Sequence, residues 1–394
     1  MKLPLIRVHA ARHKRAAGGH PWLFSNEIAM DAAAKALPAG SLVKFQAHDS
    51  SPLGIGTFNP HTLIAGRILS REPLVVIDKA WFAVRLRAAL ALREAVIAEP
   101  FYRLVHAEAD GLGGLVIDRF GDHFSVQVNT AGMERLWPMI EAALVEVFQP
   151  QSIVLHNDSA SRALEGLPRE VRMALGESAG VIEIKENGLT YFTDLVQGQK
   201  TGWYFDQRDN HALVARFAKG QSVLDLYCHA GGFGLAAAKA GASSVVGVDS
   251  SAPALALAEK ATAHNSFAKR CAWVKADVFD ELEKRSAAKE VFDIVIADPP
   301  PFVKSKKDLA AGARGYRKLA KLSASVTAQG GWLFIATCSH AMDLATFTQE
   351  VARGLHEAKR SGAILYTCGA APDHPIHPHL PESAYLKGLL IRLD

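Results

Sequence analysis

The stretch Ser222–Asp249, SVLDLYCHAGGFGLAAAKAGASSVVGVD, decides the fold. Its first part, Ser222–Cys228, is an apolar run bounded by turn residues, which predicts a strand. Gly232–Ala240 then begins a helix, and Ser244–Asp249 reads as a second strand. Outward from here, strand and helix patterns keep alternating to the end of the sequence. That alternation predicts a doubly wound α/β fold with a parallel sheet.

The same patterns predict the rest of this C-terminal region. Helices are expected at 252–264, 309–328 and 343–357, the second apart from Gly312 and Gly315. Strands are expected at 271–278, 292–300, 331–339, 363–369 and 385–393. A hairpin leads into the region, because Asn187-Gly188 is flanked by alternating apolar residues in VIEIKENGLTYFTDL. We therefore assign residues 186–394 to one α/β domain.

Two smaller regions precede this domain. Residues 1–72 contain short apolar stretches separated by Gly, Pro, Asn and His, which predicts a small barrel or compact sheet. Residues 73–185 mix both patterns: Asp78–Glu99 predicts a long helix, and Gly121–Asp122 joins two strands in a hairpin. A helix over 133–148 and a strand over 152–158 follow. The sequence thus predicts three domains, 1–72, 73–185 and 186–394.

The glycines after the first strand of the α/β domain predict a cofactor loop. Gly231, Gly232 and Gly234 let the backbone approach a ligand without a Cβ clash. Asp249 ends the second strand, where a carboxylate can bind ribose hydroxyls. Asp225 precedes the loop, and an acid there repels a dinucleotide pyrophosphate but attracts a sulfonium or an amino group. This favours S-adenosylmethionine over NAD, the alternative being a structural turn beside an unrelated acid.

Two further strand ends carry acids. Asp277 ends the third strand, where it is expected beside the adenine of the cofactor. The fourth strand, within FDIVIADPPPF, places Asp298 at the carboxyl edge of the sheet. Pro299 stiffens the turn that follows, which is expected to contact the cofactor and the base. Phe302 offers a face on which a planar base can stack. Together these groups suit a nucleobase that bears an amino group, whereas a plain proline turn is the alternative.

Cys338 ends the next predicted strand, GWLFIATCS. If that strand neighbours the fourth one, Cys338 and Asp298 share one pocket. Carbon 5 of cytosine becomes nucleophilic only after a thiolate adds to carbon 6, which is covalent catalysis. Asp298 would assist this addition at N3, and a cation or a helix N-terminus would help the thiol to ionise. The alternative is a core cysteine, as we expect for Cys228, Cys271 and Cys368.

The composition is that of an ordinary globular protein. Of 394 residues, 49% are hydrophobic and 21% are charged, and the net charge of +4 permits a nucleic-acid partner without requiring one. The four cysteines form no CxxC pair, which argues against a zinc site or a disulfide framework. No apolar run is long enough for a membrane span, and the N-terminus lacks the apolar region of a signal peptide. We therefore expect a cytoplasmic protein without membrane partners.

Two clusters of cations are candidates for RNA contacts. The first lies near the N-terminus beside Trp22 and Phe24 and includes Lys14 and Arg15. The second follows the proline turn and includes Lys304 and Arg314. A solvated charged face is the alternative for both. The segment DHPIHPH, Asp373–His379, is interrupted by prolines and lacks the partners of a metal site, so we expect a loop at a pocket edge and no metal.

With these motifs in hand, the chain resembles the bacterial large-subunit ribosomal RNA (cytosine-C5) methyltransferases that carry an N-terminal PUA domain. The resemblance covers essentially the whole chain, through HPWLFSNEI, EADGLGGLVIDRFGDHF, TGWYFDQRDN, DLYCHAGGFG, ADPPPF, TCS and YLKG. It implies a PUA β-barrel, a central α+β domain and a Rossmann-like class I catalytic domain that binds S-adenosylmethionine. It also implies that Cys338 is the nucleophile, that Asp298 holds the cytosine edge, and that Gln207 and Arg208 lie beside the cofactor.

The leading functional hypothesis is therefore an S-adenosylmethionine-dependent methyltransferase that modifies carbon 5 of a cytosine in large-subunit ribosomal RNA. A first alternative is methylation of an exocyclic nitrogen of guanine or adenine, with Cys338 as a bystander. A second alternative is a non-catalytic RNA-binding or assembly factor with a relic cofactor site. The two closing strands could also pair across a homodimer.

Overall fold

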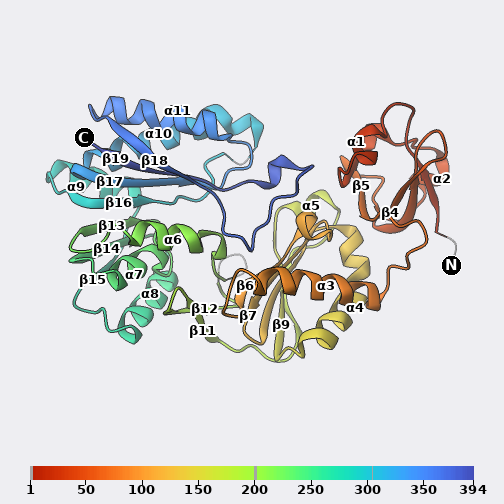
Figure 1. Ribbon diagram of the computed structural model, residues 1–394, viewed down its shortest axis with the longest axis horizontal. Helices are drawn as coiled ribbons and strands as arrows, with labels where there is room; N and C mark the ends of the chain where they lie inside the picture. The colour runs from red at the N-terminus through yellow and green to blue at the C-terminus, as the bar shows by residue number, and fades with distance from the viewer. Residues whose placement is uncertain (1–2, 199–201, 304) are drawn as a thin grey trace. The chain divides into compact units, whose positions relative to one another are not determined.

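The computed structural model describes residues 3–198, 202–303 and 305–394 (Figure 1). They form two compact units. One contains the described residues of 1–180, 194–203 and 372–383, and the other contains 181–193, 204–371 and 384–394. Each unit is therefore built from segments that are far apart in the sequence. Within the described part of the chain, no helix is both long and apolar enough to cross a membrane.

The first unit begins with a five-stranded sheet of order β1-β3-β4-β5-β2. Strand β1 runs parallel to β3, and the other neighbours are antiparallel. Buried apolar side chains such as Leu23, Phe45 and Phe58 form its core. This half-barrel confirms the small barrel or compact sheet predicted for the N-terminal region. Its elements are β1 (Leu5–Arg7), α1 (Lys14–Ala17), β2 (Trp22–Phe24), α2 (Ala32–Lys35), β3 (Ser41–Gln46), β4 (Pro52–Phe58) and β5 (Ile64–Ser70).

A second five-stranded sheet, of order β10-β9-β8-β7-β6, follows in the same unit. Strands β8 and β9 are parallel and the other pairs are antiparallel. Helices α3 and α4 share one apolar core with this sheet. The predicted hairpin at Gly121–Asp122 joins β7 to β8. The elements are α3 (Lys79–Glu94), β6 (Phe101–His106), β7 (Leu115–Phe120), β8 (His123–Val128), α4 (Ala131–Phe148), β9 (Ser152–Asn157), α5 (Ser161–Leu164) and β10 (Glu170–Leu175).

Helix α3 begins where the sequence predicts, because the side chain of Asp78 accepts a hydrogen bond from the amide of Trp81. It ends at Glu94 and not at the predicted Glu99. The amides of Val96 and Ile97 both turn back to the carbonyl of Arg93, which tightens the chain and ends the helix.

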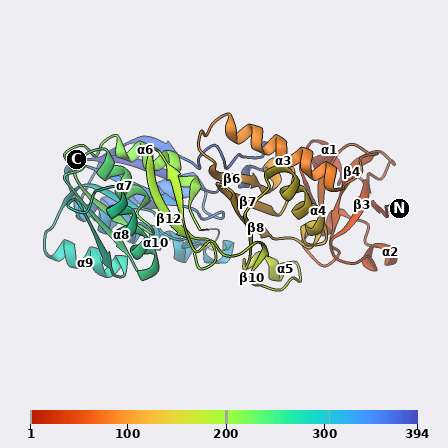
Figure 2. The same cartoon turned by 90° about the horizontal axis from the view of Figure 1, so that it is seen from below.

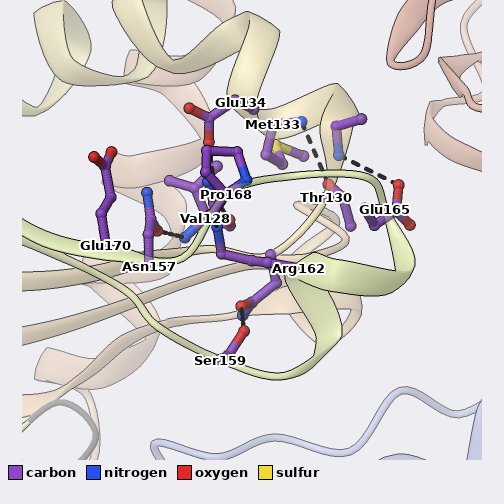
Figure 3. A network of polar contacts seen from close by, with 12 residues as sticks. Val128, Thr130, Met133, Glu134, Asn157, Ser159, Arg162, Glu165, Pro168 and Glu170 are labelled. Atoms are coloured by element: carbon purple, nitrogen blue, oxygen red, sulfur yellow. Dashed lines mark hydrogen bonds and ion pairs between the residues drawn. The ribbon is translucent and has the colours of Figure 1, made fainter.

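A buried polar network fastens the N-terminal half-barrel to the second sheet. Glu165 accepts hydrogen bonds from the side chain of Asn59 at 2.9 Å and pairs with Arg67 at 2.8 Å. Close by, Arg162 is fully buried and pairs with Glu134 at 2.8 Å (Figure 3). Buried charges are costly unless they are paired, so this network holds the two sheets of the unit in one arrangement.

The second unit contains a seven-stranded sheet of order β15-β14-β13-β16-β17-β19-β18. The first five strands are parallel, and β19 runs antiparallel between β17 and β18. This arrangement confirms the predicted doubly wound α/β sheet. The strands are β13 (Ser222–Leu226), β14 (Ser244–Asp249), β15 (Cys271–Lys275), β16 (Phe292–Ala297), β17 (Thr327–Thr337), β18 (Gly362–Cys368) and β19 (Lys387–Leu393).

Helices cover both faces of this sheet. On one face α6 and α7 lie side by side (Figures 1 and 2). On the other face α10 and α11 pack together, and α9 joins the same apolar core. The helices are α6 (Arg208–Ala215), α7 (Gly232–Lys239), α8 (Ala252–His264), α9 (Val278–Ala287), α10 (Leu309–Ser325) and α11 (Leu344–Glu357). Two faces covered by helices keep the parallel strands dry, as such sheets require.

Two local predictions in this unit meet different outcomes. The hairpin at Asn187-Gly188 is confirmed: β11 (Val181–Glu186) pairs with β12 (Leu189–Asp194), and both turn residues have positive φ. The predicted helical end at Ala328 is wrong, because α10 stops at Ser325 and Thr327 already pairs in β17.

Candidate functional site

Parallel strands bring the predicted site residues to one edge of the seven-stranded sheet. Strands β16 and β17 are neighbours, and Ala297 pairs with Ile335 in their register. Asp249 is the last residue of β14, Asp298 follows β16 directly, and Cys338 follows β17 directly. All three therefore lie at the carboxyl ends of parallel strands, where open α/β sheets bind their ligands.

The predicted glycine loop connects β13 to α7. Gly231 has a φ of +84°, a left-handed conformation that favours glycine, and α7 starts at the next residue, Gly232. The two carboxylate oxygens of Asp249 accept backbone N–H groups from His229 at 2.9 Å and from Ser251 at 2.8 Å. Asp249 thereby fixes the loop to the end of β14, and each of its oxygens keeps a second lone pair for a ligand hydroxyl.

Asp225 is buried beneath this loop. Its Oδ2 accepts the amide N–H of Gly234 at 2.8 Å, whereas its Oδ1 has no hydrogen-bond partner among the residues that the structure describes. Burial raises the pKa of Asp225 to about 8, and the charges of Asp298 and Asp249 act in the same direction. A cationic ligand beside Oδ1 would supply the missing partner. The sulfonium and ammonium groups of S-adenosylmethionine fit this requirement.

Asp277 lies at the start of α9. Its Oδ1 accepts the amides of Phe279 at 2.8 Å and Asp280 at 3.2 Å, so it caps the helix. The side chain is exposed at the edge of the sheet. Its contact with the adenine stays a prediction.

Gln207 and Arg208 lie where a 3₁₀ turn, η3 (Phe205–Gln207), meets α6. The amide nitrogen of buried Gln207 donates a hydrogen bond of 2.8 Å to Oδ2 of Asp298. The guanidinium carbon of Arg208 lies 5.5 Å from the centre of the Phe205 ring. The structure thus brings Gln207 directly to the predicted catalytic acid, while cofactor contact stays a prediction for both residues.

Tyr204 is partly buried among the charged groups of the site. Burial raises the pKa of its hydroxyl, and the neighbouring charges of Asp206, Asp298, Cys338 and Asp249 raise it further. These four groups come from four different segments, and each is near enough to the Tyr204 hydroxyl to affect its pKa. The Tyr204 ring also meets the ring of His229 edge to face, at 5.1 Å between centroids.

The turn after Asp298 is held by Tyr316 of α10. The Tyr316 hydroxyl accepts hydrogen bonds from the amide of Phe302 at 3.3 Å and from the hydroxyl of Thr337 at 2.7 Å. It therefore ties the proline turn to the end of β17. The Phe302 ring packs on Tyr316, with 4.7 Å between centroids. A Cβ on Gly312 would lie 2.6 Å from the carbonyl oxygen of Phe302, which explains why this helix carries a glycine here.

Cys338 is partly buried in the turn that Tyr316 supports. The ammonium of Lys387 donates hydrogen bonds to the carbonyls of Ser339 at 3.2 Å and Tyr385 at 3.1 Å. Burial lowers the pKa of Lys387, and the negative charges of Asp343 and Cys338 oppose that shift. The thiol therefore has a lysine side chain in its immediate electrostatic environment.

The predicted RNA-contacting cations are in different situations. Arg15 pairs with Glu27 at 2.9 Å and lies over the Phe24 ring, whereas Lys14 is exposed. Arg314 is exposed on α10, and Lys304 lies outside the described residues. Three other cations of α10 are paired with acids: Arg317 with Glu350, Lys318 with Glu283 and Lys321 with Glu357. RNA contact stays a prediction for Lys14, Arg15 and Arg314.

The DHPIHPH segment is built into the first unit by hydrogen bonds. Asp373 is fully buried, its carboxylate accepts the amide of Arg103 at 2.9 Å, and its carbonyl accepts Arg93 at the same distance. His374 contacts Asp373 at 2.8 Å, and His377 lines a cavity of about 540 Å³. Across the described residues, no group of three or more His, Cys, Asp or Glu side chains could hold a metal ion.

Sequence reasoning missed several residues of this site. Asp206 and Asn210 lie in the quoted stretch YFDQRDN, and their closeness to Gln207 was the available signal. Lys387 lies in the quoted stretch YLKG, but nothing local links it to Cys338. Tyr316 had no signal, because its role depends on how α10 packs against two turns.

Comparisons with known proteins agree with this architecture. Residues 6–71 match the family model of a PUA-like domain, and residues 153–392 match that of an S-adenosylmethionine-dependent methyltransferase. A ribosomal RNA large subunit methyltransferase I from Shewanella denitrificans is 38% identical over 98% of this chain and 99% of its own length. One from Aliivibrio fischeri is 36% identical, with the same coverage. A solved structure of a Streptococcus mutans protein, assigned as a sam-dependent methyltransferase, has the same fold, with a TM-score of 0.83 at 22% identity and coverage of 99% of this chain and 100% of its own.

Proposed function

This chain belongs to the family of ribosomal RNA large subunit methyltransferase I, and from that membership we propose that it methylates carbon 5 of a cytosine in large-subunit ribosomal RNA. Family membership shows that the chain is an S-adenosylmethionine-dependent methyltransferase. The target atom and the covalent mechanism are our proposal.

One observation carries this proposal. Asp298 and Cys338 follow neighbouring parallel strands, at the edge of the sheet that also carries the glycine loop and Asp225. A methyltransferase that modifies an exocyclic nitrogen needs no thiol at this position. A methyltransferase that modifies carbon 5 of cytosine needs a thiol and an acid on the same base, and this arrangement offers both.

The proposed reaction begins at Cys338. Its thiolate adds to carbon 6 of the cytosine and forms a carbon–sulfur bond, while a proton from Asp298 reaches N3. The electron pair then available at carbon 5 would take the electrophilic methyl group that S-adenosylmethionine supplies. The bond between that methyl group and the sulfonium would break, and its electron pair would stay on the departing sulfur. A base removes the proton from carbon 5. The carbon–sulfur bond then breaks and Cys338 leaves as thiolate, while N3 returns its proton to Asp298.

Lys387 supports the ionisation of the thiol. Its ammonium is anchored to the carbonyl of Ser339, the residue after Cys338, and the two groups influence each other's charge. A cation close to a thiol favours the thiolate, which is the nucleophilic form. The sheet itself supplies this cation, because β19 runs antiparallel beside β17 and places Lys387 opposite Thr337.

The RNA must present an unpaired base to this site. In a structured RNA the target has to be flipped out or already single-stranded, at a cost of a few kcal/mol. We propose that Phe302 contacts the base and that Arg314 contacts phosphates near the site. Lys14 and Arg15 of the PUA-like domain would contact phosphates elsewhere on the RNA. Such contacts weaken as the salt concentration rises.

Methyl transfer from labelled S-adenosylmethionine to large-subunit RNA, followed by nucleoside mass spectrometry, tests the proposal. We expect 5-methylcytidine from the wild type and none from Cys338→Ala. A methylated purine that survives the Cys338→Ala change would instead support exocyclic-nitrogen methylation. RNA binding without S-adenosylmethionine binding would support a non-catalytic factor.

A further inference from the structure

A chain of side-chain amides ends on the predicted catalytic acid. The Nδ2 group of Asn210 donates to the carbonyl of Gly369 at 3.1 Å and to Oε1 of Gln207 at 2.6 Å. The Nε2 group of Gln207 donates to Oδ2 of Asp298 at 2.8 Å. Gln207 and Asn210 are each only 3% exposed, so water competes little for these hydrogen bonds.

The backbone carbonyl of Gly369 fixes the direction of every hydrogen bond in this chain. A carbonyl can only accept, so the Asn210 group that faces it must be the NH₂ group. The same NH₂ group faces Gln207, which must therefore present its carbonyl oxygen. The NH₂ group of Gln207 is then left to face Asp298, and Oδ2 of Asp298 can only accept.

We propose that Asn210 and Gln207 are positioning residues for Asp298. They keep Oδ2 of Asp298 a hydrogen-bond acceptor, so the proton that Asp298 gives to N3 must be carried by Oδ1. This inference rests on the proposed function. If Oδ2 carried the proton, it would face the NH₂ group of Gln207 donor to donor, which leaves both buried groups without a partner. The amide chain thus selects one of the two carboxyl oxygens of Asp298 for proton transfer.

The selected oxygen also discriminates between pyrimidines. Cytosine has an unprotonated N3, which accepts the proton as the O–H bond at Oδ1 breaks and the N–H bond forms. Uracil carries a proton on N3 and offers no acceptor there. While Oδ1 carries the proton, the carboxyl group therefore favours cytosine over uracil, because the O–H group at Oδ1 and the N3–H group of uracil would meet donor to donor.

The substitution Gln207→Glu tests this proposal, because it replaces only the NH₂ group. The introduced carboxylate would face Oδ2 of Asp298, and two carboxylates at such a distance cannot both be ionised, so they must share a proton. At about pH 8 we expect kcat to be lower than in the wild type by about tenfold or more. The ratio of variant to wild-type kcat should rise as the pH falls towards about 6. Gln207→Ala should be impaired without this rise in ratio.

Gln221→Glu is the matched control, since it makes the same charge change at a glutamine that is outside the amide chain. Melting temperature and S-adenosylmethionine affinity, measured for each variant, show whether the fold and the cofactor site are retained. A ratio for Gln207→Glu that does not change with pH, or a Gln207→Ala variant with wild-type kcat, would overturn the proposal. The identity of the methylated nucleoside that the wild type makes tests the proposed function separately. The ratio of variant to wild-type kcat is measured on whichever methylated nucleoside forms.

Discussion

The ammonium of Lys387 lies 3.2 Å from the carbonyl oxygen of Ser339, the residue that follows Cys338. Removing this cation should make the thiolate harder to form, because an opposite charge nearby favours the ionised thiol. We expect Lys387→Met to slow the alkylation of Cys338 by iodoacetamide at neutral pH by several-fold. Mass spectrometry of the modified peptide measures this rate.

Lys387→Arg is the control, because it keeps a cation at the same place in β19. It should react nearly as fast as the wild type. Equal rates for the wild type and Lys387→Met would show that the lysine anchors the backbone and has no effect on the thiol.

Because of Asp225, we expect the free energy of unfolding to depend on pH in the absence of cofactor. The pKa of Asp225 is raised to about 8, above the usual 3.8 of an aspartate, so the folded protein keeps a proton that the unfolded chain releases. Stability should therefore fall as the pH rises from about 4 to about 8, by at most about 1.4 kcal/mol per pH unit from this group. Asp225→Asn should flatten this fall, as urea denaturation at several pH values would measure. An unchanged slope would contradict the assignment.

Cofactor binding should release a proton from the same carboxyl group. A cation beside Oδ1 favours the ionised form, so S-adenosylmethionine binding at neutral pH should release close to one proton. Calorimetry in two buffers of different ionisation enthalpy measures this number. Asp225→Asn should release none, and equal release from both proteins would mean that the cation lies elsewhere.

Substitution of Arg314 should change the salt dependence of RNA binding. If it contacts a phosphate, Arg314→Ala should weaken binding and reduce the slope of log affinity against log salt by about 0.7. Lys269→Ala is the matched control, since Lys269 is exposed at the opposite, amino-terminal edge of the sheet, before β15. Filter binding over a range of salt concentrations gives both slopes, and identical slopes for the two variants would remove Arg314 from the interface.

The exposed edge strand β18 leads us to expect a dimer. It is an edge strand, and Ile364, Leu365 and Tyr366 are 46%, 47% and 38% exposed. An apolar edge strand without charge or proline tends to pair with another strand. We expect the wild type to form a dimer in light scattering and Leu365→Lys to be monomeric, with Leu344→Lys on α11 as the control. A monomeric wild type would contradict this prediction.

The parts of the site that arise from short sequence patterns could be predicted. Gly231 is needed where the backbone turns left-handed, and Asp249 ends an apolar strand, so both are readable from their own neighbours. The adjacency of Asp298 and Cys338 is predicted on the condition that their two strands are neighbours, because parallel strands end at one edge of a sheet. The pairing of β16 with β17 meets that condition.

The remaining residues depend on contacts between distant segments. Asn210 and Gly369 are 159 positions apart, and no local pattern announces their hydrogen bond. Lys387 reaches the Cys338 turn only because β19 enters the sheet antiparallel between β17 and β18. That insertion is decided by tertiary packing, because the alternation of strands and helices does not specify where in the sheet the last strand lies.

The most direct test of the covalent mechanism is to trap Cys338 on the base. Large-subunit RNA transcribed with 5-fluorocytidine lacks the proton that carbon 5 must lose, so the final elimination cannot occur and the adduct persists. In the presence of S-adenosylmethionine, we predict a covalent protein–RNA complex whose digest carries a fluorinated, methylated nucleotide on Cys338. The complex should be absent in Cys338→Ala and present in Cys368→Ala. A wild type that makes 5-methylcytidine on normal RNA but forms no adduct, or one attached to another cysteine, would contradict the account.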